Sequence, residues 1–274
     1  MFRRSFIAFV LLLATSQAFG LEIKVDSDLK DWLASQPTGN SANDWTPIPG
    51  KNIKYMVDDQ TGTSGYLNPG YGGQAYDAEA IYVDMSGGYI NIAIVTGRDP
   101  DAGGYVAGDI AIDFGINGTF DIGLVTLGDG VGLGGAGELY SVTEWNYGLW
   151  SDPGIAGDPS STEFGLAHPT TVKSGNKLGA AEISYAEFTF DNDVGLGLGE
   201  FGDAGKHYVI EASISLDLID SSLSAEAFLV HWTMACANDY VQVDPPGGAV
   251  PAPAPLGLML LGLLPLLRRR SRRA

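Results

Sequence analysis

The chain has 274 residues, of which 38 are glycine, and 33 acidic against 15 basic residues give it a formal net charge of −18. This surplus of negative charge repels phosphate backbones and anionic headgroups, which argues against nucleic acid as a partner and against docking of the domain on a lipid surface. The single cysteine, Cys236, excludes an intrachain disulfide, and its apolar neighbours predict a small buried residue rather than a nucleophile.

The charge is unevenly distributed along the chain. The two terminal segments hold seven of the 15 basic residues and no acidic one, so the part between them carries eight basic against 33 acidic residues, a net charge of about −25. Such a surface favours solubility and weak cation binding. Simple solvation of the surface would account for the same composition.

Residues 1–20 have the features of a secretory signal peptide. Arg3 and Arg4 precede a mostly apolar stretch at residues 5–15, and Ala18 and Gly20 each end a small-x-small cleavage site. We therefore expect export through the Sec machinery and removal of the segment by signal peptidase. The alternative is a first transmembrane helix, against which the shortness of the apolar stretch argues.

Residues 21–243 are predicted to form one all-β domain, a single antiparallel β-sandwich. Short apolar or alternating runs are separated by long loops rich in glycine and aspartate, and helical periodicity is almost absent. The expected strands lie, in chain order, at residues 21–25, 51–57, 78–84, 89–96, 109–114, 120–126, 138–143, 165–172, 180–190, 207–215, 226–234 and 240–243.

Two of the predicted turns have clear hairpin signals. Gly87 and Gly88 separate the apolar runs at 78–84 and 89–96, and Asn117-Gly118 is typical of a type I′ turn. Before the second turn, apolar residues alternate from Ile110 to Phe114, so one face of that strand is predicted to be buried.

The C-terminal segment, residues 250–274, has three parts that follow a proline-rich linker at 244–255. Pro251, Ala252, Pro253 and Pro255 come first, an apolar helix is expected at 256–267, and a basic tail at 268–273 begins with Arg268, Arg269 and Arg270. The apolar run is short of the roughly 20 residues that span a bilayer as a helix. The pattern therefore favours a sorting signal over the alternative, an ordinary tail anchor.

This arrangement resembles the PEP-CTERM sorting signal of Gram-negative bacteria, with Ala252 in the place of the family's usual Glu. The resemblance implies processing by an exosortase-type membrane protease. The C-terminal helix would hold the protein in the inner membrane for a time, and the protein would then reach the cell surface or the extracellular matrix.

A second resemblance concerns the domain itself. Residues 25–32, Val-Asp-Ser-Asp-Leu-Lys-Asp-Trp, resemble the Asp-Gly-x-Leu-x-Asp-Trp segment of DOMON-like sandwiches and family 9 carbohydrate-binding modules, with Ser27 in place of Gly. The strands at 76–84 and 89–95 are similar to their next signature, and residues 231–239 resemble a closing segment of other PEP-CTERM surface proteins. The resemblance implies a jelly-roll or DOMON-like sandwich.

Aspartates and tryptophans in predicted loops are the candidate ligand-binding residues. Ca²⁺ takes six to eight oxygen ligands from flexible loops, so a structural Ca²⁺ would be held by members of three aspartate pairs, although none has the full EF-hand spacing. The pairs are Asp26 and Asp28, Asp99 and Asp101, and Asp191 and Asp193. Trp45, Trp145 and Trp150 offer rings that can stack on sugars, or that hold the loops on the sandwich.

No catalytic residue is predicted, because no histidine has metal-ligand spacing and no pattern singles out one carboxylate pair. We expect a non-enzymatic structural or adhesive component of an exopolysaccharide or biofilm matrix. The alternatives are a carbohydrate-binding module that uses the loop aromatics and a Ca²⁺-stabilised sandwich, and, more distantly, a glycoside hydrolase.

Overall fold

The computed structural model describes residues 23–37, 45–57, 74–128, 132–148, 168–191, 193–194, 206–237 and 239–244. The predicted signal peptide, the sorting motif with its C-terminal helix, and Trp150 lie outside these residues. Within them, the helices are the 3-10 turns η1 (Leu29–Asp31), η2 (Gln74–Tyr76) and η4 (Leu216–Leu218), and none has the length or apolarity to cross a membrane.

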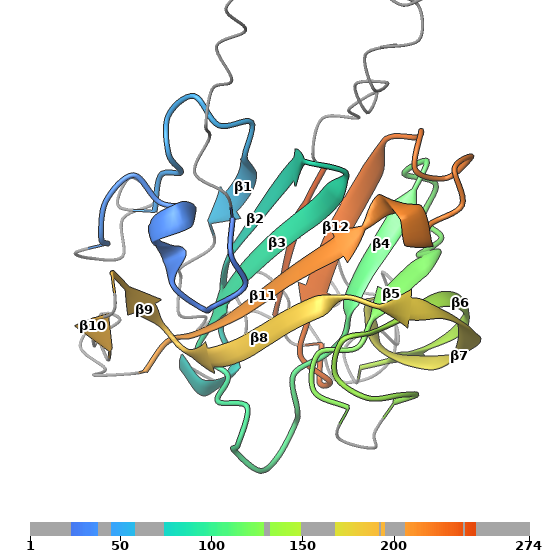
Figure 1. The fold of residues 1–274 in the computed structure, drawn as a ribbon. Coiled ribbons are helices and arrows are strands. Elements are labelled where there is room, and N and C mark those ends of the chain that lie inside the picture. Colours follow the sequence, from blue (N-terminus) through green and yellow to red (C-terminus); the bar gives the residue numbers. More distant parts are fainter. Residues whose placement is uncertain are drawn as a thin grey trace, which may run out of the picture.

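The described chain forms two antiparallel sheets that pack face to face, which confirms the all-β prediction (Figure 1). The first sheet has the order β1 (Lys54–Val57), β2 (Ala78–Ser86), β3 (Tyr89–Thr96), β11 (Tyr208–Ser215), β8 (Glu182–Glu187). The second has the order β13 (Tyr240–Val243), β12 (Phe228–Thr233), β4 (Ile110–Phe114), β5 (Ile122–Leu124), β6 (Glu138–Tyr147), β7 (Pro169–Ala180). A small separate pair joins β9 (Thr189–Phe190) to β10 (Asp193–Val194).

The core between the sheets is built from alternate residues of their strands, because successive side chains of a strand point to opposite faces. Ile110, Ile112 and Phe114 lie in this core as the alternation predicted, while Ala111 faces outward into another cluster. The largest aromatic ring, that of Trp232, is fully buried, and its Nε1–H donates to the carbonyl of Gly108 at 2.9 Å. The core therefore satisfies the polar atom of its bulkiest side chain.

The outer face of the first sheet is covered by the N-terminal segment. Leu29, Trp32, Leu33 and Trp45 pack there with outward-facing residues of β2, β3 and β11 in a second buried cluster. Both faces of this sheet are thus apolar, and for that reason its strands are near-continuous apolar runs in the sequence.

Glu211, on the outer face of β11, holds the N-terminal segment in place. One carboxylate oxygen accepts hydrogen bonds from the backbone N–H groups of Asp26, at 2.8 Å, and Ser27, and the other accepts from Trp32 Nε1 at 2.7 Å. Burial raises the pKa of Glu211 to about 8, against the effect of the three donors. Ser27 has φ of +61°, and its hydroxyl lies 2.7 Å from that of Ser184 on β8.

The outer face of the second sheet is covered by the hairpin of β6 and β7. Register shifts along this pair bend it, as β-bulges do, and three of its side chains pack on the outer face of β5 at Gly123. A Cβ at Gly123 would lie 2.4 Å from Val172 and 2.9 Å from both Trp145 and Val142. The glycine therefore makes room for the folded-back hairpin.

Several strand boundaries differ from the prediction, and three differences matter here. Residues 173–179, which the prediction left between two strands, continue strand β7, and β6 extends to Tyr147, so Trp145 lies in a strand rather than in a loop. Pairing between the two long strands accommodates the glycines at 175 and 179. The described part of the predicted first strand, residues 23–25, pairs with no strand.

We predict that Glu211→Gln lowers the free energy of unfolding. The amide offers one acceptor oxygen in place of two, so at least one buried N–H loses its acceptor, at a cost of about 1–3 kcal/mol. For a domain of this size the melting temperature should fall by roughly 2–4 °C per kcal/mol.

The control is Glu182→Gln, the same change at an exposed position on the neighbouring strand β8, which should leave the melting temperature unchanged. In a double-mutant cycle the effects of Trp32→Phe and Glu211→Gln should be less than additive, because without the indole donor one of the hydrogen bonds that the amide cannot accept is already absent. Equal melting temperatures for the two Glu→Gln variants would show that this carboxylate does not hold the segment.

Candidate binding site

The predicted calcium ligands Asp28 and Asp191 meet around a lysine. The backbone N–H of Asp191 donates to Asp28 Oδ1 at 2.9 Å, and Lys30 Nζ lies 3.2 Å from Asp28 Oδ2 and 3.3 Å from Asp191 Oδ1. Burial raises the pKa of Asp28, but the N–H groups of Lys30 and Asp191 and the ammonium outweigh it and hold the pKa below its ordinary value. The cation between these carboxylates is thus an ammonium.

The carboxylates of two other predicted calcium ligands close turns. Asp26 Oδ1 accepts from the N–H of Asp28 at 3.0 Å, and Asp99 Oδ1 accepts from the N–H of Asp101 at 2.8 Å. Asp193 pairs through its backbone in β10. The described residues contain no group of three or more His, Cys, Asp or Glu side chains that could hold a metal ion. A structural Ca²⁺ stays a prediction of the sequence.

Many carboxylates serve the interior rather than the surface. Nine described carboxylates are buried: Asp28, Asp31, Asp77, Glu79, Asp84, Asp109, Asp113, Glu211 and Asp239. Asp109 accepts from the N–H groups of Thr126 at 3.1 Å and Val172 at 2.8 Å, and Asp113 accepts from both N–H groups of the turn at 117–118, at 3.1 and 2.7 Å. Solvation of the surface therefore does not account for all of the acidic composition.

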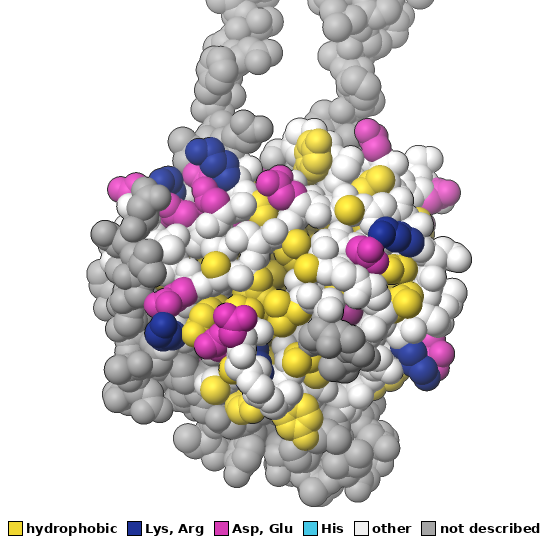
Figure 2. Space-filling view, turned by 60° about the horizontal axis from the view of Figure 1, so that its bottom comes forward, with side chains coloured by type: hydrophobic (Ala, Val, Ile, Leu, Met, Phe, Trp, Pro, Cys, Tyr) yellow, Lys and Arg dark blue, Asp and Glu magenta, His cyan; other side chains and the backbone are white. Residues whose placement is uncertain are grey.

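The remaining charges of the described surface are dispersed. On the face that Figure 2 shows, acidic side chains lie singly or beside a lysine or arginine, with hydrophobic side chains gathered between them. Exposed pairs such as Lys173 with Glu144, at 2.5 Å, and Lys206 with Glu187, at 2.9 Å, fit this picture. This face presents no single large acidic patch.

The predicted sugar-stacking tryptophans are buried where the structure describes them. Trp45 is 2% exposed and lies 6.0 Å from the ring of Phe188, and Trp145 is 7% exposed, with its Nε1–H donating to the Phe120 carbonyl at 2.9 Å. Both rings are almost fully buried, and their contacts fit the alternative that the rings fix their segments to the sheets.

Two groups of titratable side chains are buried. The ring of His168 is tilted against those of Tyr240 and His231, with centroids 4.6 Å and 5.3 Å away, and burial lowers the pKa of His168 to about 4 and that of His231 well below its ordinary value. His207 Nδ1 lies 2.6 Å from a carboxylate oxygen of Glu79. Their burial suits packing roles. The prediction of a buried Cys236 is confirmed.

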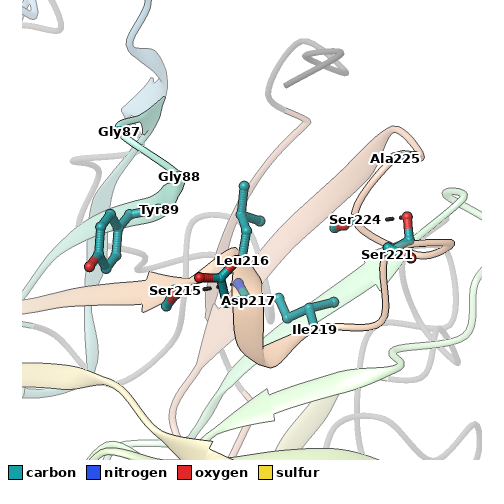
Figure 3. A pocket seen from close by; sticks show the side chains of 10 residues that line it. All are labelled: Gly87, Gly88, Tyr89, Ser215, Leu216, Asp217, Ile219, Ser221, Ser224 and Ala225. Carbon is teal, nitrogen blue, oxygen red and sulfur yellow. Dashed lines mark hydrogen bonds between the residues drawn. The ribbon is translucent and has the colours of Figure 1, made fainter. Parts of the chain in front are cut away.

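A groove lies between the β2–β3 turn and the segment that joins β11 to β12. It is open to solvent and has a volume of about 920 Å³. In Figure 3, Tyr89 lies on one side of Leu216, and Ser221 and Ser224 lie on the other. Tyr89 is 45% exposed, so its ring is available to a ligand.

Hydrogen bonds of the backbone hold the walls of the groove together. Gly87 and Gly88 have φ of +62° and +87°, as a tight hairpin turn requires, and the N–H of Leu216 donates to the Gly88 carbonyl at 2.9 Å. The hydroxyl of Ser215 caps η4 by accepting from the N–H of Asp217 at 3.3 Å. The turn is thereby tied to the opposite wall.

A smaller groove of about 550 Å³ lies against the β6–β7 hairpin. Its lining includes Tyr147, which is 54% exposed, and the Glu144–Lys173 ion pair. The sequence does not single out Tyr89 as a ligand-binding residue, because it has the pattern of an ordinary strand residue. For Tyr89, the tight glycine turn directly before it was the available signal.

Comparisons with family models, with curated proteins and with solved structures gave no match to this chain.

We predict that the buried histidines make the domain less stable as the pH falls below about 6.5. The unfolded chain binds protons near its ordinary histidine pKa, while folded His168 stays neutral until about pH 4. Stability should therefore fall by about 1.4 kcal/mol per pH unit for each such histidine over that range.

Denaturant unfolding of the native protein and His168→Phe at pH 7, 6 and 5 tests this. Below pH 6.5, the free energy of unfolding of the native protein should fall, relative to that of the variant, by about 1.4 kcal/mol per pH unit. The comparison cancels Glu211, whose raised pKa acts in the opposite direction and removes stability as the pH rises from about 4.5 to 8. Parallel pH profiles for the two proteins would contradict the prediction.

Proposed function

We propose that the protein is an exported, non-catalytic component of the cell surface or extracellular matrix of a Gram-negative bacterium. The observation that carries this proposal is the separation of charge along the chain. Seven of the 15 basic residues lie in two terminal segments with export and sorting features, and the acid-rich part between them contains the two packed sheets. The two terminal segments direct export and sorting, and the sandwich acts outside the cell in a structural or adhesive role.

The use of the carboxylates supports a non-catalytic role. A general acid or nucleophile must reach the reacting atoms of a substrate. Asp109, Asp113 and Glu211 are buried and instead accept hydrogen bonds from the protein's own N–H groups. These acids stabilise connections between strands and turns.

We also propose that the sandwich is of the DOMON-like type. Ser27 occupies the position at which the resemblance has glycine, and its backbone has φ of +61°. Glycine adopts this left-handed conformation without strain, whereas other residues do so at a cost. The glycine of the DOMON-like segment and the strained serine here would both adopt the left-handed conformation with which the chain turns across Glu211.

The C-terminal segment is proposed to be a substrate of an exosortase-type membrane protease. Prolines at 251, 253 and 255 keep the linker extended, the apolar run at 256–267 enters the bilayer, and the arginines from Arg268 stay on the cytoplasmic side. Cleavage near the prolines would release the domain, which would join an exopolysaccharide matrix.

We predict that protein recovered from the cell surface has lost both terminal segments. Its intact mass should correspond to a chain that begins after Ala18 or Gly20 and ends near residues 251–255. Replacing Arg268, Arg269 and Arg270 by serine should leave the C-terminal segment uncleaved, because the basic tail that orients it is removed.

Ala252→Glu, which restores the family's motif, serves as the matched control and should be processed at least as well as the native chain. Recovery of the protein only from the inner membrane, with its C-terminus intact, would identify a permanent anchor and overturn the sorting proposal.

A further inference from the structure

The groove beside Tyr89 has the size and shape of a binding site for an extended ligand. Its volume of about 920 Å³ lies within the range of ligand pockets, roughly 300–1,000 Å³. It is open to solvent and runs between two segments that the hydrogen bond from the N–H of Leu216 to the Gly88 carbonyl joins; Figure 3 shows the residues of both segments. An open groove of this kind suits a chain that passes through it.

The exposed ring of Tyr89 distinguishes this groove from most of the described surface. Tyr55 is also exposed but stacks on Tyr82 at 5.9 Å, and Tyr105 lies edge-on to Tyr76 at 6.4 Å. Tyr89 makes no such ring contact with another described residue. Its apolar face is therefore free to cover a ligand.

The polar lining consists of hydroxyl groups and one carboxylate. Ser215, Ser221 and Ser224 contribute hydroxyls, which both donate and accept, and exposed Asp217 contributes an acceptor. An aromatic face beside such groups matches a sugar ring, which presents apolar C–H groups on its faces and hydroxyls around its edge.

The charge of the groove selects against anions. No lysine, arginine or histidine is among the described residues that line it, and Asp217 adds a negative charge to a part of the chain with a net charge of about −25. Phosphate, sulfate and uronic-acid groups would be repelled. The class of ligand that fits this lining is therefore an uncharged polyhydroxyl chain.

We propose that this groove binds a neutral glycan chain, with Tyr89 stacking on one sugar ring and Asp217 and the serine hydroxyls hydrogen-bonded to sugar hydroxyls. The proposal goes beyond a surface location and does not depend on how the C-terminus is processed. In this proposal the residue that stacks on the sugar is a tyrosine rather than one of the buried tryptophans.

The test uses the purified full chain in affinity electrophoresis through gels that contain dextran, a soluble β-glucan or polygalacturonic acid, together with an array of neutral and acidic glycans. We expect binding to at least one neutral probe and none to polygalacturonic acid. Tyr89→Ala should weaken that binding at least tenfold and Asp217→Asn several-fold, while Tyr89→Phe should keep most of it, because it retains the ring.

Tyr147→Ala is the matched control, since it removes an exposed ring from the smaller groove. It should bind like the native chain, and all four variants should melt within a few degrees of it because the altered side chains are exposed. Absence of binding to every neutral probe, preference for the acidic polymer, or loss of binding in Tyr147→Ala but not in Tyr89→Ala would each overturn the proposal.

Discussion

The three hydrogen bonds that Glu211 accepts close the outer face of the first sheet. They fix the backbone at Asp26 and Ser27 and the indole of Trp32, and these place the N-terminal segment over Tyr82 and its neighbours. Without that segment, apolar residues of three strands would face water, at a cost of about 25 cal/mol for each Å² of apolar surface. The buried side chain of Glu211 thus helps to hold the cover of a sheet that is apolar on both faces, together with the hydrogen bond from the Tyr82 hydroxyl to the Trp45 carbonyl.

Short-range sequence patterns predict much of the fold. The alternation from Ile110 to Phe114 and the glycine turn before Tyr89 are properties of a few adjacent residues, and the structure has the strands and faces that they predict. The bent hairpin of β6 and β7 depends on contacts between distant residues, such as Gly123 with Val172. No local pattern encodes such a contact, so the sequence did not predict that residues 173–179 continue the strand.

The acidic composition shows a second limit of prediction from sequence. A count of charges gives the net charge but not the location of each carboxylate. Asp109 and Asp113 are buried acceptors for the backbone, while Asp28 shares Lys30 with Asp191. Aspartate suits these positions because its short side chain reaches N–H groups in turns. Some of the carboxylates whose number suggested calcium sites and a solvated surface thus accept hydrogen bonds from the main chain instead.

The candidate site was the least predictable feature, for reasons of side-chain size and polarity. Tryptophan has the largest apolar surface and gains most from burial, so a tryptophan in a long segment tends to fold inward, as Trp45 and Trp145 do. Tyrosine tolerates exposure, and at a strand's first position Tyr89 lies where the sheet ends. The hydrogen bond between Leu216 and Gly88 ties the turn that precedes Tyr89 to the start of η4 before any ligand arrives. A groove prearranged in this way loses little conformational freedom on binding, which is the condition under which a few weak stacking and hydroxyl contacts give useful affinity.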